Sequence, residues 1–179
     1  MALQAGASGV PFAAVPGLIG SDLMAVRDDF RIIDDPFAPE RRVAIAPAIA
    51  PAFALVHALR ADPDGNLIIP ASGDDALLIQ ASRTVIATAE EVAPDATRTL
   101  TADERLVPGV YVDALAPAPQ GAHPLACQSH YPTDAAHIRR YLDAAHDPQS
   151  FHAYLDAYVY GPADHAAYLE RVLPEAAVV

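Results

Sequence analysis

The polar residues with the clearest capacity for chemistry follow the apolar run of residues 53–56. This run is short, lies between prolines, and is typical of a strand that is covered on both faces. His57, Arg60, Asp62 and Asn66 stand at its exit. Ligands of open α/β sheets bind at the carboxyl ends of strands. The pattern therefore predicts a polar site at the end of this strand.

His57 allows two interpretations. Beside Asp62, it could orient a substrate carboxylate or act as an acid or base. It could instead hydrogen-bond the turn that follows and stabilise its backbone, and this is favoured because buried polar groups are usually satisfied locally. Asp64, Gly65 and Asn66 are typical turn formers, although the Asn66 side chain could still point inward.

Glu90 and Glu91 close a second apolar segment, residues 84–92, and resemble a catalytic carboxylate pair. Neighbouring residues on a strand point to opposite faces, so the two carboxylates cannot converge on one substrate. Ion pairs also account for charge at strand ends. We interpret both glutamates as structural or interface groups.

Cys127, His130 and His137 have residue types that bind zinc. They lack a second close pair and lie in a loop followed by a helix, so we predict no metal site and interpret the histidines as surface residues. The single cysteine excludes an intrachain disulfide, and no signal peptide or membrane-spanning apolar segment is visible. The sequence predicts a cytoplasmic location.

Composition excludes further classes of function. The net charge of −12 disfavours binding to nucleic acid or to an anionic membrane, because both require a basic face. All 11 basic residues are arginines, which excludes a Schiff-base lysine. The sequence contains no GxxxxGK[ST], GxGxxG or GxSxG pattern, so nucleotide hydrolysis, simple dinucleotide binding and a hydrolase elbow have no support.

The elements expected around these residues alternate strands with helices. Strands are predicted at residues 43–46, 67–70, 84–92 and 110–115, with the second pairing back across the turn at 64–66. Helices are predicted over residues 1–9, after Asp74 or Asp75, from Thr133 or Asp134, from a cap at Ser150 to Gly161, and from Asp164. This succession predicts an α/β sheet, parallel or mixed, followed by a helical region.

Four segments in order resemble the A (alpha) subunit of family I CoA-transferases, particularly the glutaconate CoA-transferase type. They are GVPF with GLIGSD, LVHALRADPDGN, TVIATAEEV and VPGVYVDALAPAPQGAHP, and the tail from HYPTDAAHIRRYL is similar as well. The resemblance implies a Rossmann-like open sheet of the NagB/RpiA-like type. It also implies a single domain over residues 1–179, with sheets in 1–125 and a helical tail in 133–173.

The resemblance further implies a B subunit partner that carries the nucleophilic glutamate, so no catalytic residue is assigned to this chain. An acyl-CoA thioester and a carboxylic acid are the expected substrates, with no bound cofactor. Backbone amides of glycine loops can stabilise an oxyanion. The residues expected to contact the CoA thioester are accordingly Gly9, Val10, Pro11, Phe12, Gly20 and Ser21, with His57 and Asn66 as weaker candidates.

The resemblance begins inside a helix at Met1, without the glycine-rich segment that family A subunits carry. The chain is therefore expected to correspond to the C-terminal portion of such a subunit. Two alternatives to the transferase remain open. One is a CoA-transferase-like hydrolase that opens a ring in an acyl-CoA, and the other is a noncatalytic, truncated scaffold.

Overall fold

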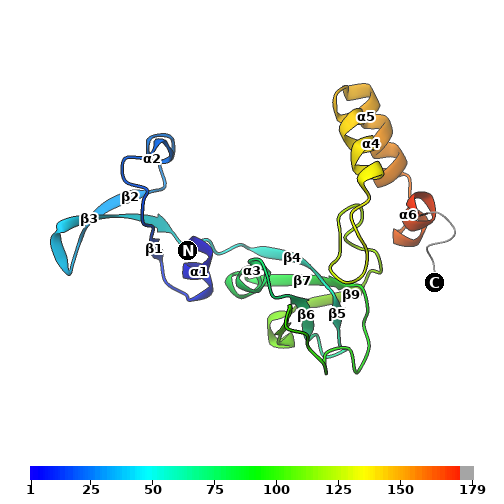
Figure 1. Cartoon of the computed structure of the whole chain (residues 1–179), viewed down its shortest axis with the longest axis horizontal. Coiled ribbons are helices and arrows are strands. Elements are labelled where there is room, and N and C mark those ends of the chain that lie inside the picture. The colour runs from blue at the N-terminus through cyan, green and yellow to red at the C-terminus, as the bar shows by residue number, and fades with distance from the viewer. Residues whose placement is uncertain (174–179) are drawn as a thin grey trace.

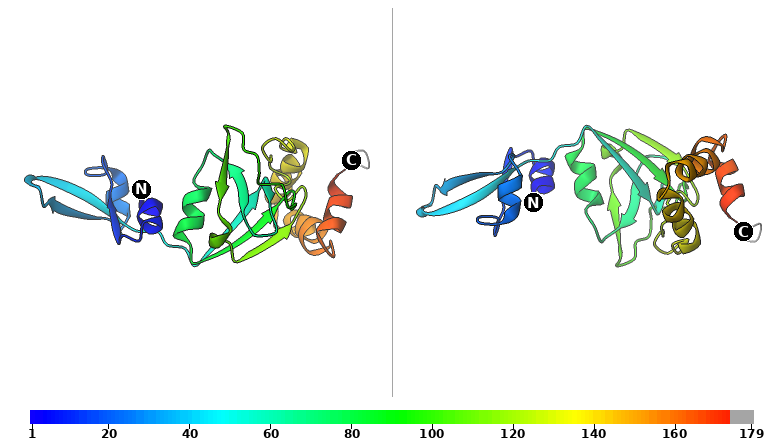
Figure 2. Two further views of the ribbon diagram at one scale, coloured as in Figure 1. Left: turned by 90° about the horizontal axis from the view of Figure 1, so that it is seen from below. Right: turned by 90° about the horizontal axis from the view of Figure 1, so that it is seen from above.

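The computed structural model describes residues 1–173 of the chain, which form an elongated molecule with three small sheets (Figure 1). A hairpin-bearing N-terminal part and a set of C-terminal helices lie at opposite ends, with the remaining sheets between them (Figure 2). Residues 174–179, the end of the predicted single domain, lie outside the described residues. No helix within residues 1–173 is long and apolar enough to cross a membrane.

The N-terminal part contains two short helices and an antiparallel sheet of order β1-β3-β2. Its elements are α1 (Ala2–Ala7), β1 (Phe12–Ala14), α2 (Asp22–Val26), β2 (Arg31–Asp35) and β3 (Ala38–Pro47). The turn between β2 and β3 is held by the buried Asp35 carboxylate, which accepts hydrogen bonds from the Phe37 amide at 2.9 Å and from Arg41 Nε at 2.8 Å. The expected strand at residues 43–46 is thus half of a longer hairpin.

A parallel sheet of order β4-β7-β9 occupies the centre of the molecule. Its strands are β4 (Phe53–Ala58), β7 (Thr84–Ala89) and β9 (Ala114–Pro117), and α3 (Asp75–Ala81) lies in the connection between the first two. The register places Leu55 opposite Ile86, and His57 opposite Thr88. The predictions of an α/β fold and of strands in the segments that form β4 and β7 are confirmed.

One face of this parallel sheet is covered by the main core, and much of the other face is exposed. Ala54, Val56, Val85 and Ala87 belong to the main core, where Ile79 of α3 joins them with residues of β6 and β8. On the opposite face Phe53, Leu55 and Ile86 are exposed, at 65%, 74% and 40% of their surface. The prediction that residues 53–56 are covered on both faces is therefore wrong, because the loop after β9 reaches the second face only near His57 within residues 1–173.

The third sheet is antiparallel, with the order β5-β6-β8. It consists of β5 (Arg60–Ala61), β6 (Leu67–Pro70) and β8 (Glu104–Val107). Residues 53–66 are thus not one strand, because the chain passes into a different sheet after Leu59, which is fully buried in a second core cluster with Ile68 and Cys127. The predicted return of residues 67–70 across the turn is confirmed, with β5 as the partner strand. The 67–70 segment pairs with β5 and β8, and β4 pairs with β7.

Two predicted elements are displaced in the structure. Pro108 initiates a single 3-10 turn, η1 (Gly109–Tyr111), so the expected strand at 110–115 begins only at Ala114. The helix expected from Ser150 begins earlier, because Asp147 is its cap and accepts hydrogen bonds from both the Ser150 amide and hydroxyl at 2.8 and 2.9 Å. A proline at the first helical position accommodates the earlier start.

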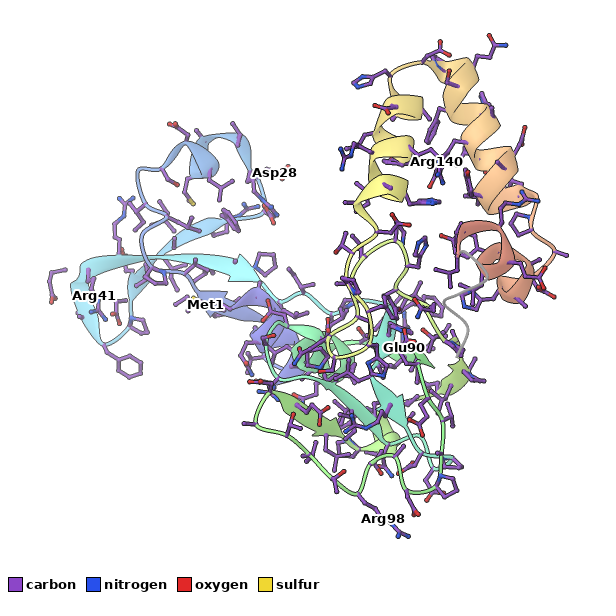
Figure 3. All side chains as sticks on the ribbon, turned by 45° about the vertical axis from the view of Figure 1, so that its right-hand side comes forward. Met1, Asp28, Arg41, Glu90, Arg98 and Arg140 are labelled. Atoms are coloured by element: carbon purple, nitrogen blue, oxygen red, sulfur yellow. The ribbon has the colours of Figure 1, made fainter. Side chains whose placement is uncertain are left out.

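The C-terminal helices are α4 (Ala135–Ala145), α5 (Pro148–Leu155), the π-helical turn η2 (Asp156–Tyr160) and α6 (His165–Val172). Asp134, one of the two predicted starts, caps α4, and Asp164 caps α6 as predicted. Figure 3 shows Arg140 between α4 and α5, where its guanidinium lies over the Tyr158 ring. His137 is not a surface residue as predicted, since it is 1% exposed and its ring packs edge-on against Tyr154 and Tyr158.

Candidate functional site

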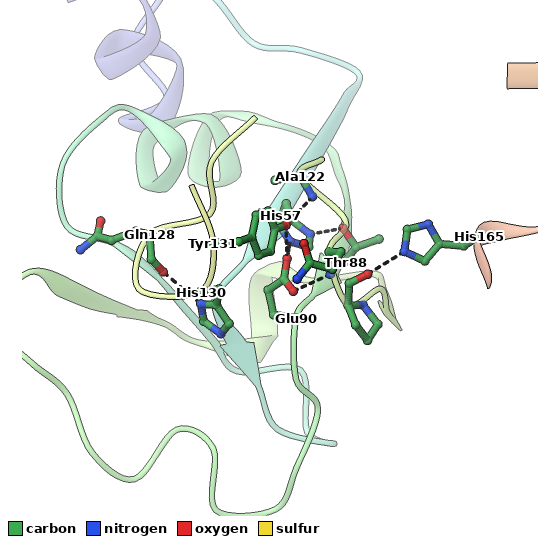
Figure 4. Close-up of polar contacts among 10 residues, drawn as sticks. His57, Thr88, Glu90, Ala122, Gln128, His130, Tyr131 and His165 are labelled. Atoms are coloured by element: carbon green, nitrogen blue, oxygen red, sulfur yellow. Dashed lines mark hydrogen bonds and ion pairs between the residues drawn. The ribbon is translucent and has the colours of Figure 1, made fainter. Parts of the chain in front are cut away.

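A polar cluster lies where the parallel strands β4 and β7 end side by side (Figure 4). We call it the His57–Glu90 cluster. It consists of the side chains of His57, Thr88, Glu90 and Tyr131 together with the backbone amide of Gln120. His57 and Thr88 come from adjacent strands, whereas Gln120 and Tyr131 come from the loop after β9. The carboxyl edge of the sheet thus carries a polar group, as the sequence predicts for this position.

His57 spans the two strands. Its Nδ1 atom lies 2.8 Å from the Thr88 hydroxyl oxygen, and its Nε2 atom lies 2.7 Å from Oε1 of Glu90. The alternation of side chains on a strand places His57 on the same face as the exposed Leu55. Its side chain is 18% exposed, so it remains partly accessible to solvent.

Glu90 holds the loop after β9 against the sheet. The Gln120 amide donates to Oε2 at 2.6 Å, and the Tyr131 hydroxyl donates to Oε1, which His57 also contacts. The Ala122 amide in turn donates to the Tyr131 hydroxyl oxygen at 2.9 Å. One carboxylate therefore fixes both ends of the 120–131 loop.

The cluster strongly perturbs its ionisable groups. Burial opposes ionisation of Glu90, but the hydrogen bonds from Tyr131, His57 and the Gln120 amide outweigh it and lower the pKa of this carboxyl. Burial and the nearby Glu90 charge raise the pKa of Tyr131, and they raise the pKa of Cys127 to about 11. At neutral pH the cluster therefore contains a carboxylate and a phenol, with a protonated thiol beside them.

This geometry makes Glu90 an anchor rather than a nucleophile. Its side chain is 5% exposed and both oxygens accept hydrogen bonds, so the carboxylate is shielded from solvent and bound to the loop. The interpretation of Glu90 as structural agrees with these contacts. Glu91 follows it on the surface, as expected for the next residue along the chain.

Gly121 allows the loop to approach the histidine closely. A Cβ atom at this position would lie 2.7 Å from Cε1 of His57 and 2.7 Å from the carbonyl oxygen of Ala118. Gln120 and Tyr131 were not predicted as members of the site. No periodicity marks them, and only the fold of the loop brings them to Glu90.

Two groups of side chains within residues 1–173 have metal-ligand types close together. In the first, His57, Glu90 and Cys127 lie together, and both oxygens of Glu90 already accept hydrogen bonds, from His57, Tyr131 and the Gln120 amide. The second group is His123, Asp134 and His137. There the Arg140 guanidinium lies 3.4 Å from Nδ1 of His137 and places a positive charge beside the group.

The three residues considered for zinc in the sequence are not assembled. Cys127 is in the second core cluster, whereas the exposed His130 contacts the Gln128 carbonyl oxygen at 3.0 Å. His137 lies in α4 and contacts the Tyr154 hydroxyl through Nε2 at 2.8 Å.

The predicted contact residues near the N-terminus lie on other elements than the His57–Glu90 cluster. Gly9, Val10, Pro11 and Phe12 connect α1 to β1, and the side chains of Val10 and Phe12 are about half exposed. These residues lie toward the N-terminal end of the elongated molecule, whereas His57 lies at the far end of β4 (Figure 1). They therefore do not converge with His57 within this structure.

Gly20 and Ser21 precede α2. Gly20 has a φ of +82°, which fits the predicted turn, and the Ser21 hydroxyl donates to the Leu18 carbonyl at 2.7 Å. This second predicted loop is also remote from His57 in the fold (Figure 1). Its role in ligand contact remains a prediction.

Asn66 and Asp62 form a structural clamp away from His57. The Asn66 amide group donates to Asp62 at 2.8 Å, and its side-chain oxygen accepts from the Gly109 amide at 2.9 Å. Asp62 also accepts from the Thr97 hydroxyl at 2.6 Å. Asp62 therefore does not lie beside His57, because it follows β5 of the third sheet. The favoured interpretation of His57, a hydrogen bond to the turn that follows it, is wrong as well, because its partners are Thr88 and Glu90.

Comparison with known proteins shows which family this chain resembles. The coenzyme A transferase family model matches residues 1–118. The A subunit of glutaconate CoA-transferase from Acidaminococcus fermentans is 31% identical over 96% of this chain and 59% of its own length. The A subunit of 3-oxoadipate CoA-transferase from Pseudomonas knackmussii is 29% identical over 94% of this chain and 59% of its own length.

Solved structures agree. The crystal structure of the Acidaminococcus fermentans glutaconate coenzyme A-transferase superposes with a TM-score of 0.88, at 30% identity, over 96% of this chain and 59% of the other. The crystal structure of the decarboxylase AibA/AibB superposes with a TM-score of 0.70, at 34% identity, over 86% of this chain and 56% of the other. This chain thus spans about three fifths of the length of the curated relatives it matches. It belongs to the coenzyme A transferase family and is similar to the A subunits of family I.

Proposed function

We propose that this chain acts as the A subunit of an enzyme that moves CoA from an acyl-CoA to a carboxylic acid. The observation that carries the proposal is the likeness to glutaconate CoA-transferase, which extends over 96% of the chain at a TM-score of 0.88. Both curated relatives described above are A subunits of CoA-transferases. Such a subunit implies a B subunit, which we propose as the partner. The predicted cytoplasmic location is part of this proposal.

In the proposed reaction the thioester carbonyl is attacked by a carboxylate of the B subunit. The C–S bond breaks, CoA leaves as a thiolate, and a mixed anhydride forms. The thiolate then attacks the glutamyl carbonyl, which releases the first acid and gives a glutamyl-CoA thioester. The acceptor carboxylate then attacks the glutamyl-CoA thioester, CoA leaves as a thiolate, and a second mixed anhydride forms. The thiolate attacks the acceptor's carbonyl in this anhydride, which releases the glutamate and gives the new acyl-CoA. Glu90 has no nucleophilic part in this scheme, because its oxygens are occupied by three donors.

The contribution proposed for this chain is positional. The His57–Glu90 cluster holds the 120–131 loop at the carboxyl edge of the parallel sheet, and this edge is where α/β proteins bind ligands. The loops at Gly9 and Gly20 remain proposed contacts for the acyl or pantetheine part of the substrate. Their backbone amides would serve as oxyanion donors.

The test is a transfer assay on this chain combined with its B subunit. CoA should appear on the acceptor acid, and a glutamyl thioester that borohydride or hydroxylamine traps should form on the B subunit. Trapping on Glu90 of this chain would overturn the assignment. A Glu90→Gln variant, whose loop is held less firmly, should transfer CoA more slowly but still place the trapped thioester on the B subunit.

Two other results would contradict the proposal. Release of free CoA without need of an acceptor acid would assign the hydrolase activity instead. An assembled complex with neither activity would assign the noncatalytic scaffold.

A further inference from the structure

The peptide unit between Pro119 and Gln120 is held from two sides (Figure 4). Nε2 of His165 lies 2.7 Å from the carbonyl oxygen of this peptide and, since a carbonyl only accepts, the histidine donates. The N–H of the same peptide donates to Oε2 of Glu90 at 2.6 Å. His165 is the first residue of α6, whereas Glu90 follows β7. One peptide therefore links a C-terminal helix to the end of a central strand.

The backbone beside this peptide is strained. Gln120 has a φ of +60°, in the left-handed region that residues other than glycine adopt only at an energetic cost. Such a conformation persists where the surrounding structure holds it. Here the hydrogen bonds from His165 and to Glu90 hold the peptide that precedes the strained residue. Loss of either contact should therefore loosen the start of the 120–131 loop.

A second contact joins α6 to the same loop. The Tyr168 hydroxyl oxygen lies 2.7 Å from Nδ1 of His123, and Nε2 of His123 lies 3.3 Å from Oδ2 of Asp134. Because a carboxylate only accepts, the neutral ring donates to it through Nε2 and accepts the Tyr168 proton through Nδ1. His165 and Tyr168 lie three positions apart on one face of α6, and their rings stack. This face of α6 thus contacts the loop at both Pro119 and His123.

We propose that α6 helps to position the candidate site, with His165 and Tyr168 as positioning residues. They act through the 120–131 loop, because His165 fixes the Pro119–Gln120 peptide and this peptide fixes the Glu90 carboxylate. Hydrogen bonds in series polarise one another, so each of the two contacts on the peptide strengthens the other. The effect on catalysis rests on the function proposed above, whereas the coupling of α6 to the loop does not.

The alternative is that these contacts only fasten α6 to the rest of the protein. Their loss would then detach the helix and leave the loop closed by Glu90, which accepts from the Gln120 amide and the Tyr131 hydroxyl. The single cysteine of the chain distinguishes the two cases. Cys127 lies within the loop and is 6% exposed, so it reacts with a reagent in solution only when the loop opens.

Labelling of Cys127 with a maleimide at pH 7 measures this opening in the complex of the chain with its B subunit. Mass spectrometry of the peptide that contains Cys127 separates it from any thiol of the B subunit. Both His165→Ala and Tyr168→Phe should speed the labelling by about threefold or more, as expected for the loss of one hydrogen bond. His165→Gln, whose amide group can still donate to the Pro119 carbonyl, should restore a rate near that of the parent.

His152→Ala in α5 and Tyr160→Phe in η2 change exposed residues of the same two types and should leave the labelling rate unchanged. Combining His165→Ala with Glu90→Gln tests whether both residues act on one peptide. The two effects should multiply to less than their product, because the second loss acts on a peptide that is already released. Equal labelling of His165→Ala and the parent, or effects that multiply in full, would overturn the proposal.

The transfer assay supplies a second measurement. His165→Ala should lower kcat for CoA transfer by about threefold or more, with the melting temperature of the complex changed by less than about 4 °C. His165→Gln should restore kcat. An unchanged kcat in a complex whose Cys127 labels faster would refute the positioning role. A parent complex that transfers no CoA would contradict the function proposed above, and the labelling rates would still decide whether α6 is coupled to the loop.

Discussion

The Nε2 atom of His57 lies 2.7 Å from Oε1 of Glu90, although 33 residues separate them in the chain. The contact joins the ends of two parallel strands and, through the same carboxylate, the loop that follows the third. Its members are mostly enclosed, so the hydrogen bonds act in a medium of low polarity. Stability and loop order should therefore depend on this one carboxylate.

Replacing Glu90 by glutamine should lower the free energy of unfolding by about 2 kcal/mol, because the amide cannot accept all three hydrogen bonds that the carboxylate accepts. Urea denaturation of this chain in complex with its B subunit measures the free energy of unfolding. Glu91→Gln, at the exposed neighbouring position, should change it by less than about 0.5 kcal/mol. Equal effects of the two variants would show that the cluster does not anchor the loop.

A Gly109→Ala variant should lose about 2 to 3 kcal/mol of stability through steric overlap. A Cβ atom there would lie 2.3 Å from the Asp64 carbonyl oxygen and 2.9 Å from the Gly65 carbonyl carbon, and both are backbone atoms that cannot rotate away. The exposed neighbour Val110, changed to alanine, is the control and should be nearly neutral. Thermal denaturation of both variants compares them directly, and an unchanged melting temperature for Gly109→Ala would refute the close packing of η1 on the turn.

Acid should weaken the third sheet through Glu104. Arg60 Nη1 lies 2.8 Å from its carboxylate, and this pairing, with the Thr101 amide, lowers the pKa of Glu104 to about 2. A depressed folded-state pKa contributes stability above the unfolded value near 4.5, and that stability is lost as the pH falls toward 2. Because Arg60 remains partly solvated, we expect on the order of 1 to 2 kcal/mol at pH 7.

Denaturation between about pH 6 and pH 2.5 measures this contribution. Glu104→Gln should flatten the fall in stability over the lower part of that range. Asp95→Asn removes an exposed ion pair with Arg98 and should leave the fall unchanged. A slope that survives in Glu104→Gln would assign the acid sensitivity to other carboxyls.

The α4–α5 pair should lose stability at mildly acidic pH. Burial, and then the neighbouring His123 and Arg140, lower the pKa of His137, so the folded state prefers the neutral ring. Stability from a depressed histidine pKa is complete above the unfolded value of about 6.5 and falls as the pH drops below it. His123, Asp134, Arg140 and the Tyr154 hydroxyl are the polar groups that face this ring.

Far-UV circular dichroism melts at about pH 7.5 and 5.5 test this expectation. His137→Gln, which can still donate to or accept from Tyr154, should reduce the difference between the two melting temperatures. The exposed His130→Gln should not change it. The prediction fails if the two variants and the parent chain show the same pH dependence.

The sequence by itself determined the segments that form β4 and β7, the start of α6 at Asp164, and the family resemblance, since these depend on local patterns of apolar residues, turn formers and ordered motifs. It limited the start of α4 to Thr133 or Asp134. It also placed His57 correctly at the end of a strand. Local pattern did not reveal that the chain leaves the sheet at Leu59, because a continuous apolar run reads the same whether it stays in one sheet or enters another.

Only the tertiary structure decided the partners of the polar groups. It separated Asp62 from His57, joined Glu90 to Gln120 and Tyr131, and buried His137 among tyrosines. It also showed that Leu55 and Ile86 face solvent, which a hydrophobic run alone would not suggest. The physical reason is that hydrogen bonding and burial depend on residues brought close by the fold, and the contacts of Glu90 with His57 and Gln120 span 33 and 30 positions of the chain.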